Sequence, residues 1–183
     1  MQTTAEAKPR RTPATRRAAP ARHAVKRGTK HSELHGIEDF RAFYEASQST
    51  AGTLRVIALI RAGIPASEIA VLAERMGLSK DTLMRTLQLP RATVDRKAKA
   101  DERLSSDQSE RVIGMAKLVG QVQALVERSG QPAGFNAAQW VAHWLDQPAP
   151  ALGGERPADL MDTVAGQQIV ADLLAKMESG AYA

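Results

Sequence analysis

Basic and hydroxyl side chains that could hold a nucleic acid gather between Ser79 and Lys99 of this 183-residue chain. The segment has a local charge balance of +4, whereas the chain after Leu104 holds five basic against nine acidic residues. Lysine and arginine neutralise phosphates, and arginine also reads guanine edges in the major groove. The candidate DNA-contacting residues are Arg85, Arg91, Thr93, Arg96, Lys97 and Lys99.

Turn-forming residues divide this region into short helices, which is typical of a helix-turn-helix. Gly77 ends one predicted helix, Ser79 caps the next, and Pro90 starts a third that runs to about Lys99. The recognition helix could be residues 79–87 or residues 90–99. We favour the second because it carries more phosphate-holding and guanine-reading donors, while a merely solvated surface helix is the plainer alternative.

The residue types that support catalysis or metal binding are scarce. The absence of cysteine excludes a disulfide, a thiolate zinc site and a cysteine nucleophile. The four histidines form no triad, and the composition around His31 and His35 favours a solvated pair over a zinc site; the others are His23 and His143. We therefore expect no enzyme activity, no metal and no cofactor.

Composition favours an all-α fold, since aromatic residues make up only 4% of the chain and Ala, Leu and Val dominate. The length allows two small helical units. No apolar run approaches the ~18 residues of a membrane span, and no signal peptide is apparent. We expect a cytoplasmic protein that does not enter a membrane.

The N-terminal segment, residues 1–33, is rich in Pro, Ala, Thr and Arg and poor in hydrophobic residues, which predicts a disordered tail. Residues 1–30 contribute +8 to a net charge of +5, so the remainder carries −3. The tail could lie along DNA phosphates as a basic arm or remain a solvated leader, and both readings stay open.

A long helix is expected after Ser105, which can form a capping box with Gln108. Its apolar stripe is either the core of the chain or a seam between two copies: Val112, Met115, Val119, Val122 and Val126. The break at residues 130–134 separates a predicted helix-turn-helix and dimerisation region, residues 34–130, from a C-terminal unit, residues 131–183.

The C-terminal unit should contain two main helices. Asn136 caps the first, and Trp140 and Trp144 share one of its faces and anchor a small core. Thr163 caps the last helix, and Gly180 is placed to end it, which leaves a short tail of Ala181, Tyr182 and Ala183.

Two sets of residues resemble the Xre/MbcA/ParS antitoxins in order along residues 50–183. The central set is Thr93-Val94-Asp95-Arg96-Lys97, Arg103-Leu104-Ser105 and Glu110-Arg111. The C-terminal set is Trp144-Leu145, Pro148, Leu152-Gly153-Gly154, Arg156-Pro157, Leu160-Met161, Gly166 and Glu178-Ser179-Gly180-Ala181-Tyr182-Ala183. The family pattern has a second arginine where this chain has Lys97, which keeps the charge but loses bidentate geometry.

The resemblance implies a type II antitoxin whose partner toxin carries an NAD-consuming RES domain with an ADP-ribosyltransferase-like fold. It implies that the C-terminal helix and tail lie at the active-site cleft of the toxin and that the pair represses its own operon. We also expect a homodimer within the larger toxin-antitoxin complex. The implied toxin-binding residues are Arg156, Asp159, Met177, Gly180, Tyr182 and Ala183. Arg156 and Asp159 could equally be a local i, i+3 pair.

Two other functions are compatible with the sequence. One is a plain transcriptional regulator whose C-terminal unit only dimerises. The other is a protein-binding adaptor with no DNA role. Salt-dependent binding to its own promoter excludes the adaptor, and a linked toxin gene argues against the plain regulator.

Overall fold

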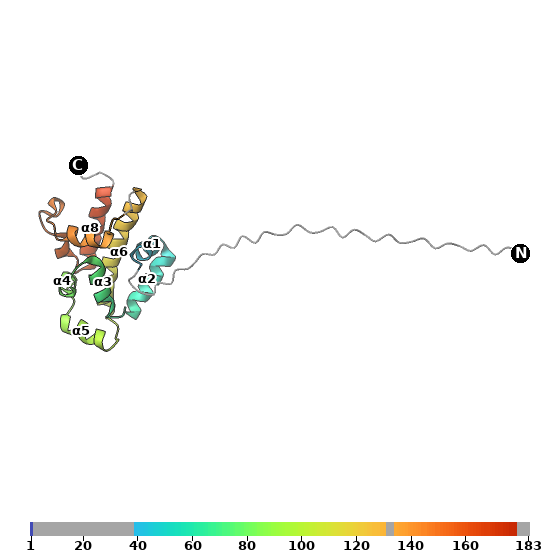
Figure 1. Ribbon diagram of the computed structural model, residues 1–183, viewed down its shortest axis with the longest axis horizontal. Coiled ribbons are helices and arrows are strands. Elements are labelled where there is room, and N and C mark those ends of the chain that lie inside the picture. Colours follow the sequence, from blue (N-terminus) through green and yellow to red (C-terminus); the bar gives the residue numbers. More distant parts are fainter. Residues whose placement is uncertain (2–38, 131–133, 179–183) are drawn as a thin grey trace. The chain divides into compact units, whose positions relative to one another are not determined.

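The computed structural model describes residues 39–130 and 134–178, together with residue 1. The chain divides into two units, residues 1–31 and residues 32–183, and every helix in the described part lies in the second (Figure 1). The expected N-terminal tail beyond residue 1 and the expected tail residues Gly180, Tyr182 and Ala183 lie outside the described residues.

Helices make up the second unit, which confirms the predicted all-α class. In the described residues the only β-type pairing is an isolated bridge between Pro65 and Arg103. The elements are α1 (Phe40–Ser47), α2 (Thr50–Ala62), α3 (Glu68–Met76), α4 (Lys80–Thr86), α5 (Arg91–Lys99), α6 (Ser106–Arg128), α7 (Ala137–Leu145), the 3₁₀ helices η1 (Pro150–Leu152) and η2 (Pro157–Leu160), and α8 (Val164–Glu178).

The long helix α6 is the centre of the unit, and α1, α2, α7 and α8 all pack against it (Figure 1). Its predicted apolar stripe is buried within the chain from Val112 to Val122, and Val126 is partly buried. The stripe therefore serves as intrachain core. At its start, the Ser105 amide donates to the Gln108 side chain at 3.2 Å, as expected for a capping box.

Two glycines of α6 allow its neighbours to approach closely. A Cβ on Gly120 would lie 2.0 Å from the Phe40 carbonyl oxygen of α1, and one on Gly114 would overlap the Gln167 side chain of α8. Gln167 is buried, and its Nε2 donates to the carbonyls of Arg111 at 3.0 Å and Met161 at 2.9 Å. This polar bridge fixes α8 to α6, because a buried amide without partners is costly.

The helix boundaries between α3 and α5 agree with the turn-forming residues identified in the sequence. Gly77 adopts φ 66° at the end of α3, and the Ser79 hydroxyl accepts from the Thr82 amide at 3.0 Å at the start of α4. Pro90 precedes α5. One face of α3 is apolar and buried: Ile69, Leu72, Ala73 and Met76.

Proline is common at the first position of a helix, yet Pro65 does not open α3. Residues 64–66 pair instead with residues 102–104, where the Leu104 amide donates to the Ile64 carbonyl at 2.8 Å and the Ala66 amide to the Glu102 carbonyl at 3.0 Å. Because these backbone groups are engaged across the chain, regular helix begins only at Glu68.

The caps of α7 and α8 agree with the sequence. Asn136 Oδ1 accepts from the Gln139 amide at 3.1 Å, and Thr163 Oγ1 accepts from the Gly166 amide at 3.0 Å. The buried residues of the two helices are largely aliphatic: Ala137, Ala138, Val141, Leu145, Val170, Leu173 and Leu174.

Candidate functional site

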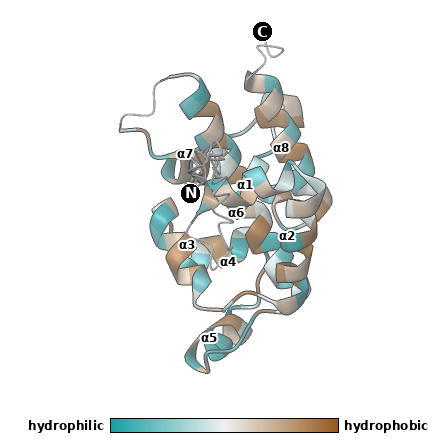
Figure 2. Cartoon of the chain, turned by 90° about the vertical axis from the view of Figure 1, so that its right-hand side faces the viewer, coloured by the Kyte–Doolittle hydropathy of each residue, from teal (hydrophilic) through white to brown (hydrophobic). Residues whose placement is uncertain are grey.

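Helix α5 projects from one end of the second unit, and α8 lies toward the opposite end in both ribbon views (Figure 1 and Figure 2). Val94 is the only buried residue of α5. The side chains of Arg91 and Arg96 are 67% and 61% exposed. A helix that is this open and this basic can reach the phosphates of a nucleic acid.

The base of α5 is attached to α2 and α3 through the pairing of residues 64–66 with residues 102–104. The Arg103 guanidinium adds a hydrogen bond to the Gly63 carbonyl at 2.6 Å. Gly63 adopts φ 76°, and a Cβ there would lie 2.3 Å from the Leu104 carbonyl oxygen, so the crossing requires glycine. These contacts hold a lightly packed helix in a fixed direction.

Carboxylates of the chain orient the basic side chains of α5 before any ligand is bound. Arg91 pairs with Asp81 at 2.7 Å, and Arg96 pairs with Glu102 at 3.0 Å. Lys97 Nζ donates to the Arg103 carbonyl at 2.7 Å. Exposed ion pairs such as these contribute little to stability, so a phosphate can replace the carboxylates at low cost.

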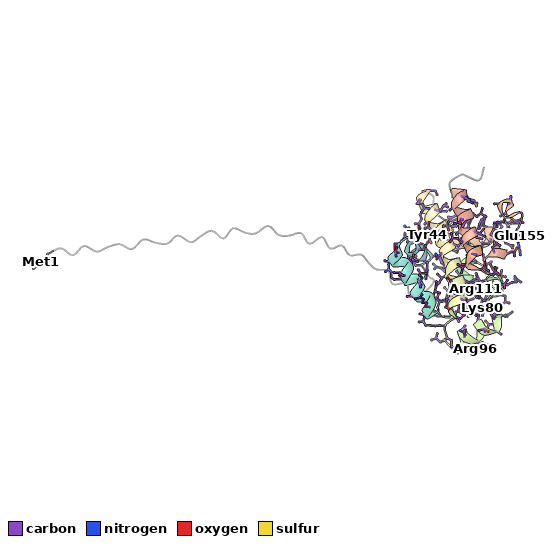
Figure 3. The ribbon with its side chains drawn as sticks, turned by 180° about the vertical axis from the view of Figure 1, so that it is seen from behind. Met1, Tyr44, Lys80, Arg96, Arg111 and Glu155 are labelled. Carbon is purple, nitrogen blue, oxygen red and sulfur yellow. The ribbon has the colours of Figure 1, made fainter. Side chains whose placement is uncertain are left out.

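Helices α4 and α5 are linked by a second pair of charges. Lys80 Nζ donates to Asp95 Oδ1 at 2.5 Å. This hydrogen bond lowers the pKa of the Asp95 carboxyl, aided by the nearby charges of Lys80, Arg91 and Lys99. In Figure 3 Arg96 lies at the end of the unit, and Lys80 lies on the neighbouring helix.

Arg85 lies apart from the other predicted DNA contacts. Together with Thr82 and Thr86 it lines a cleft of ≈ 720 Å³ whose opposite wall contains His143 and Asp146. The outward face of α4 is therefore opposed by the C-terminal helices, whereas that of α5 is open. Thr93 and Lys97 are partly buried on α5, and Lys99 is exposed at its end.

Sequence reasoning did not predict that Lys80 and Asp81 of α4 pair with side chains of α5. It also missed Asp146, which pairs with Arg156 in the C-terminal segment. Asp81 and Arg91 are ten positions apart, and Lys80 and Asp95 are fifteen apart. Neither separation follows a helical period. No sequence signal could have paired these residues, because a turn lies between the helices that carry them.

Arg156 holds the loop between α7 and α8 together. Its guanidinium donates to both carboxylate oxygens of Asp159, at 3.0 and 2.8 Å, and to Asp146 Oδ1 at 2.9 Å. These contacts raise the pKa of Arg156 and lower that of Asp159, in each case mainly through the hydrogen bond between the two. The pair is the local support that its spacing allows, and about half of each side chain stays exposed.

Exposed apolar side chains are concentrated in the C-terminal helices. Met177, a predicted toxin contact, is 41% exposed near the end of α8, and Ile169 and Val164 of the same helix are about half exposed. The segment is acidic: residues 134–178 hold six Asp and Glu against Arg156 and Lys176. Its surface therefore differs in both charge and hydrophobicity from that of α5.

Within the described residues, no group of three His, Asp or Glu side chains could hold a metal ion. In the same part of the chain, no helix combines the length and the apolar character that crossing a membrane requires.

Comparisons with known proteins match each of the two surfaces to a family of domains. Residues 55–117 match the model of the antitoxin Xre-like helix-turn-helix domain, and residues 133–180 match that of the antitoxin Xre/MbcA/ParS C-terminal toxin-binding domain. The chain is 42% identical over 158 residues to the Prs ADP-ribosylating antitoxin of Sphingobium sp. (strain YBL2), which covers 85% of this chain and 96% of that relative. The chain belongs to the Xre/MbcA/ParS family of antitoxins.

A more distant relative is antitoxin Xre of Yersinia enterocolitica serotype O:8 / biotype 1B (strain NCTC 13174 / 8081). The two are 27% identical over 136 residues, which is 66% of this chain and 86% of the relative. In the present chain, the segment matched to the helix-turn-helix domain includes α3, α4 and α5, and the segment matched to the toxin-binding domain includes α7 and α8.

Proposed function

We propose that this antitoxin binds and sterically blocks a RES-domain toxin that degrades NAD, and that it represses its own operon through α5. The observation that carries the proposal is the separation of two surfaces with opposite charge. The basic helix α5 lies at one end of the unit, and an acidic, partly apolar surface lies on the segment matched to a toxin-binding domain. One chain can thus hold operator DNA and a protein at once.

The DNA half of the proposal assigns recognition to α5. Its arginines, Arg91 and Arg96, are well exposed and could exchange carboxylates of the chain for phosphates or guanine edges. Helix α4 is the less favourable reader because Arg85 faces the cleft toward α7. Arg85 remains a proposed contact, with Thr93, Lys97 and Lys99.

A homodimer is part of the same proposal, since helix-turn-helix proteins read two half-sites about one helical turn apart. A single α5 of nine residues makes too few base contacts for a specific operator. Operator binding also places the protein in the bacterial cytoplasm, where the DNA is.

The toxin half rests on the C-terminal segment. Tyr182 and Ala183 follow α8 in the sequence, and Tyr182 supplies an aromatic ring. A cleft that binds NAD accepts such a ring. The Sphingobium relative is named an ADP-ribosylating antitoxin, and ADP-ribosylation is NAD-dependent chemistry of the kind expected of a RES toxin.

Co-purification with the product of the adjacent gene tests the central claim. We expect a stable complex in which NAD consumption is lost, and salt-dependent binding of that complex to the promoter of the operon. Promoter binding without a toxin partner would favour the plain regulator. A toxin complex that never binds the promoter would favour the adaptor.

Deleting residues 181–183 tests the proposed tail. Inhibition of the toxin should be abolished, while operator binding stays unchanged because α5 lies elsewhere. Full neutralisation by the truncated chain would contradict the assignment of Tyr182 and Ala183.

A further inference from the structure

Three aromatic side chains form a row along one side of α7. The rings of Phe135 and Trp140 lie 6.3 Å apart at 45°, and those of Trp140 and Trp144 lie 5.9 Å apart and nearly parallel, at 7°. Trp140 and Trp144 are the only tryptophans of the chain. We call these three residues the aromatic row.

The aromatic row is not what fills the core beneath α7. Aliphatic side chains do so, with Val141, Leu145 and Val170 all 3% exposed or less. Phe135 is 38% exposed, and both tryptophans are only partly buried. This differs from the expectation that Trp140 and Trp144 anchor the core: they lie at its edge, because small and branched residues already fill the space between α6, α7 and α8.

Leaving such rings partly in water forfeits stabilisation, since fully burying a large apolar side chain contributes ~1.5–3 kcal/mol. Tryptophan and tyrosine are the residues most enriched at interface hot spots, where a partner completes their burial. The stacking of Trp140 on Trp144 also fixes the orientation of both rings in advance, which lowers the entropy cost of binding.

The position of the row on α7 restricts what it can meet. Gln139, His143 and Asp146 lie on one flank of the helix and line the cleft toward α4. By the helical period, Trp140 and Trp144 lie about 100° around α7 from these residues, between them and the buried face of the helix. Neither tryptophan lines the cleft.

We infer that the aromatic row is a principal contact for the toxin, which meets it with an apolar patch of its own. The inference rests on the proposed function. All three residues lie within residues 133–180, the segment matched to a toxin-binding domain, and that match begins two residues before Phe135. A short tail supplies few contacts, so tight binding requires a folded surface as well, and tethering then raises the effective concentration of the tail.

Fluorine NMR tests the inference directly. The full chain, grown with 5-fluorotryptophan, gives two signals, one from each tryptophan of the row, and it is titrated with a catalytically inactive toxin. We expect both signals to shift or broaden on binding. Signals that stay unmoved while the toxin binds tightly would overturn the inference and leave the antitoxin function intact.

Phe135→Ser is the matching variant, because Phe135 precedes α7 and its loss opens no cavity in the core. We expect the Kd for the toxin to rise at least tenfold with operator binding unchanged. Leu54→Ser is the control: it alters a more exposed apolar side chain, 61% exposed on α2, and should change that Kd less than twofold.

Two other outcomes are decisive. An unchanged Kd for the Phe135→Ser variant, or conversion of a dimer into a monomer by that variant, overturns the inference, since a second copy would then cover the row. Failure of the unaltered chain to bind the toxin at all removes the proposed function itself.

Discussion

Helices α4 and α5 and the turns before them share a sequence pattern but have different surroundings. Residues 76–85 and 87–96 align as MGLSKDTLMR and LQLPRATVDR, with leucine, threonine and arginine at matching positions. Gly77 and Gln88 both adopt positive φ, 66° and 46°, and a short helix follows each. The same local pattern thus produces the same local structure twice, eleven residues apart.

The two copies differ in what covers them. Helix α4 packs against α3, buries Leu83 and Met84, and faces α7 across a cleft. Helix α5 buries Val94 alone. The comparison shows that a helix-turn-helix pattern specifies a turn and a helix, whereas exposure decides which helix can reach DNA.

Among the substitutions that compare α4 with α5, truncation of the buried leucine of α4 should have the largest effect, and that effect is on the free energy of unfolding. Leu83 is fully buried, so Leu83→Ala should lower the free energy of unfolding by ~2–5 kcal/mol. Val94, at the equivalent position of α5, is also fully buried, but Val94→Ala should cost only ~1–2 kcal/mol because valine loses fewer carbon atoms than leucine. Urea denaturation measures both, and a loss for Val94→Ala as large as that for Leu83→Ala would show that α5 is packed at least as firmly as α4.

Arg85 of α4 and Arg96 of α5 occupy matching positions, so replacing each by alanine compares the contributions of the two helices to DNA binding. Arg96→Ala should weaken operator binding by ~10- to 100-fold, the range for a side chain that reads a base. Arg85→Ala should change it by less than about threefold if that side chain makes at most a peripheral phosphate contact. Fluorescence anisotropy at two salt concentrations measures this, and the reverse order would assign recognition to α4.

Substitutions at the two positive-φ residues, Gly77 and Gln88, should change the stability of the chain in opposite directions. Gly77→Ala should destabilise the chain by ~1 kcal/mol, since the site has space for a Cβ but its φ strains any L residue. Gln88→Gly should instead stabilise it by ~0.5 kcal/mol, because relief of the same strain is partly offset by unfolded-state entropy. Thermal unfolding of both variants tests the prediction, which fails if the two shifts share a sign.

The charged link between the helices predicts a small pH effect. Since the folded pKa of Asp95 lies below the unfolded value of about 3.9, its contribution to stability is present above that value. It is lost as pH falls through the folded pKa. Asp95→Asn should therefore unfold more easily than the unaltered chain at pH 7, and the difference should disappear once the pH lies below the folded pKa of Asp95. A difference that persists at the lower pH would point to a cause other than ionisation.

The helix starts and the apolar stripe of α6 could be predicted from the sequence because neighbouring residues specify them. Ser79, Asn136 and Thr163 cap helices by bonding backbone amides three residues ahead, so neighbouring residues specify those helix starts. The apolar stripe of α6 follows a helical period. Its burial followed from that pattern, but the choice between core and seam needed the packed structure.

The remaining features depend on residues far apart in the chain. The pairing of residues 64–66 with residues 102–104 displaced the start of α3, and no local pattern marks it. Lys80 and Asp81 meet α5 only because a turn folds the helices together. The tryptophans were expected in the core, since sequence gives hydrophobicity and spacing but not the volume that aliphatic neighbours already occupy.

The sequence by itself determined the helices, their caps, the concentration of positive charge between Ser79 and Lys99 and the membership of an antitoxin family, because each is encoded by neighbouring residues or by residues in fixed order. Only the tertiary structure decided that α4 lines a cleft, that α5 stands free and that the aromatic row stays at the edge of the core. Exposure depends on which distant segments pack together, and that is a property of the whole fold.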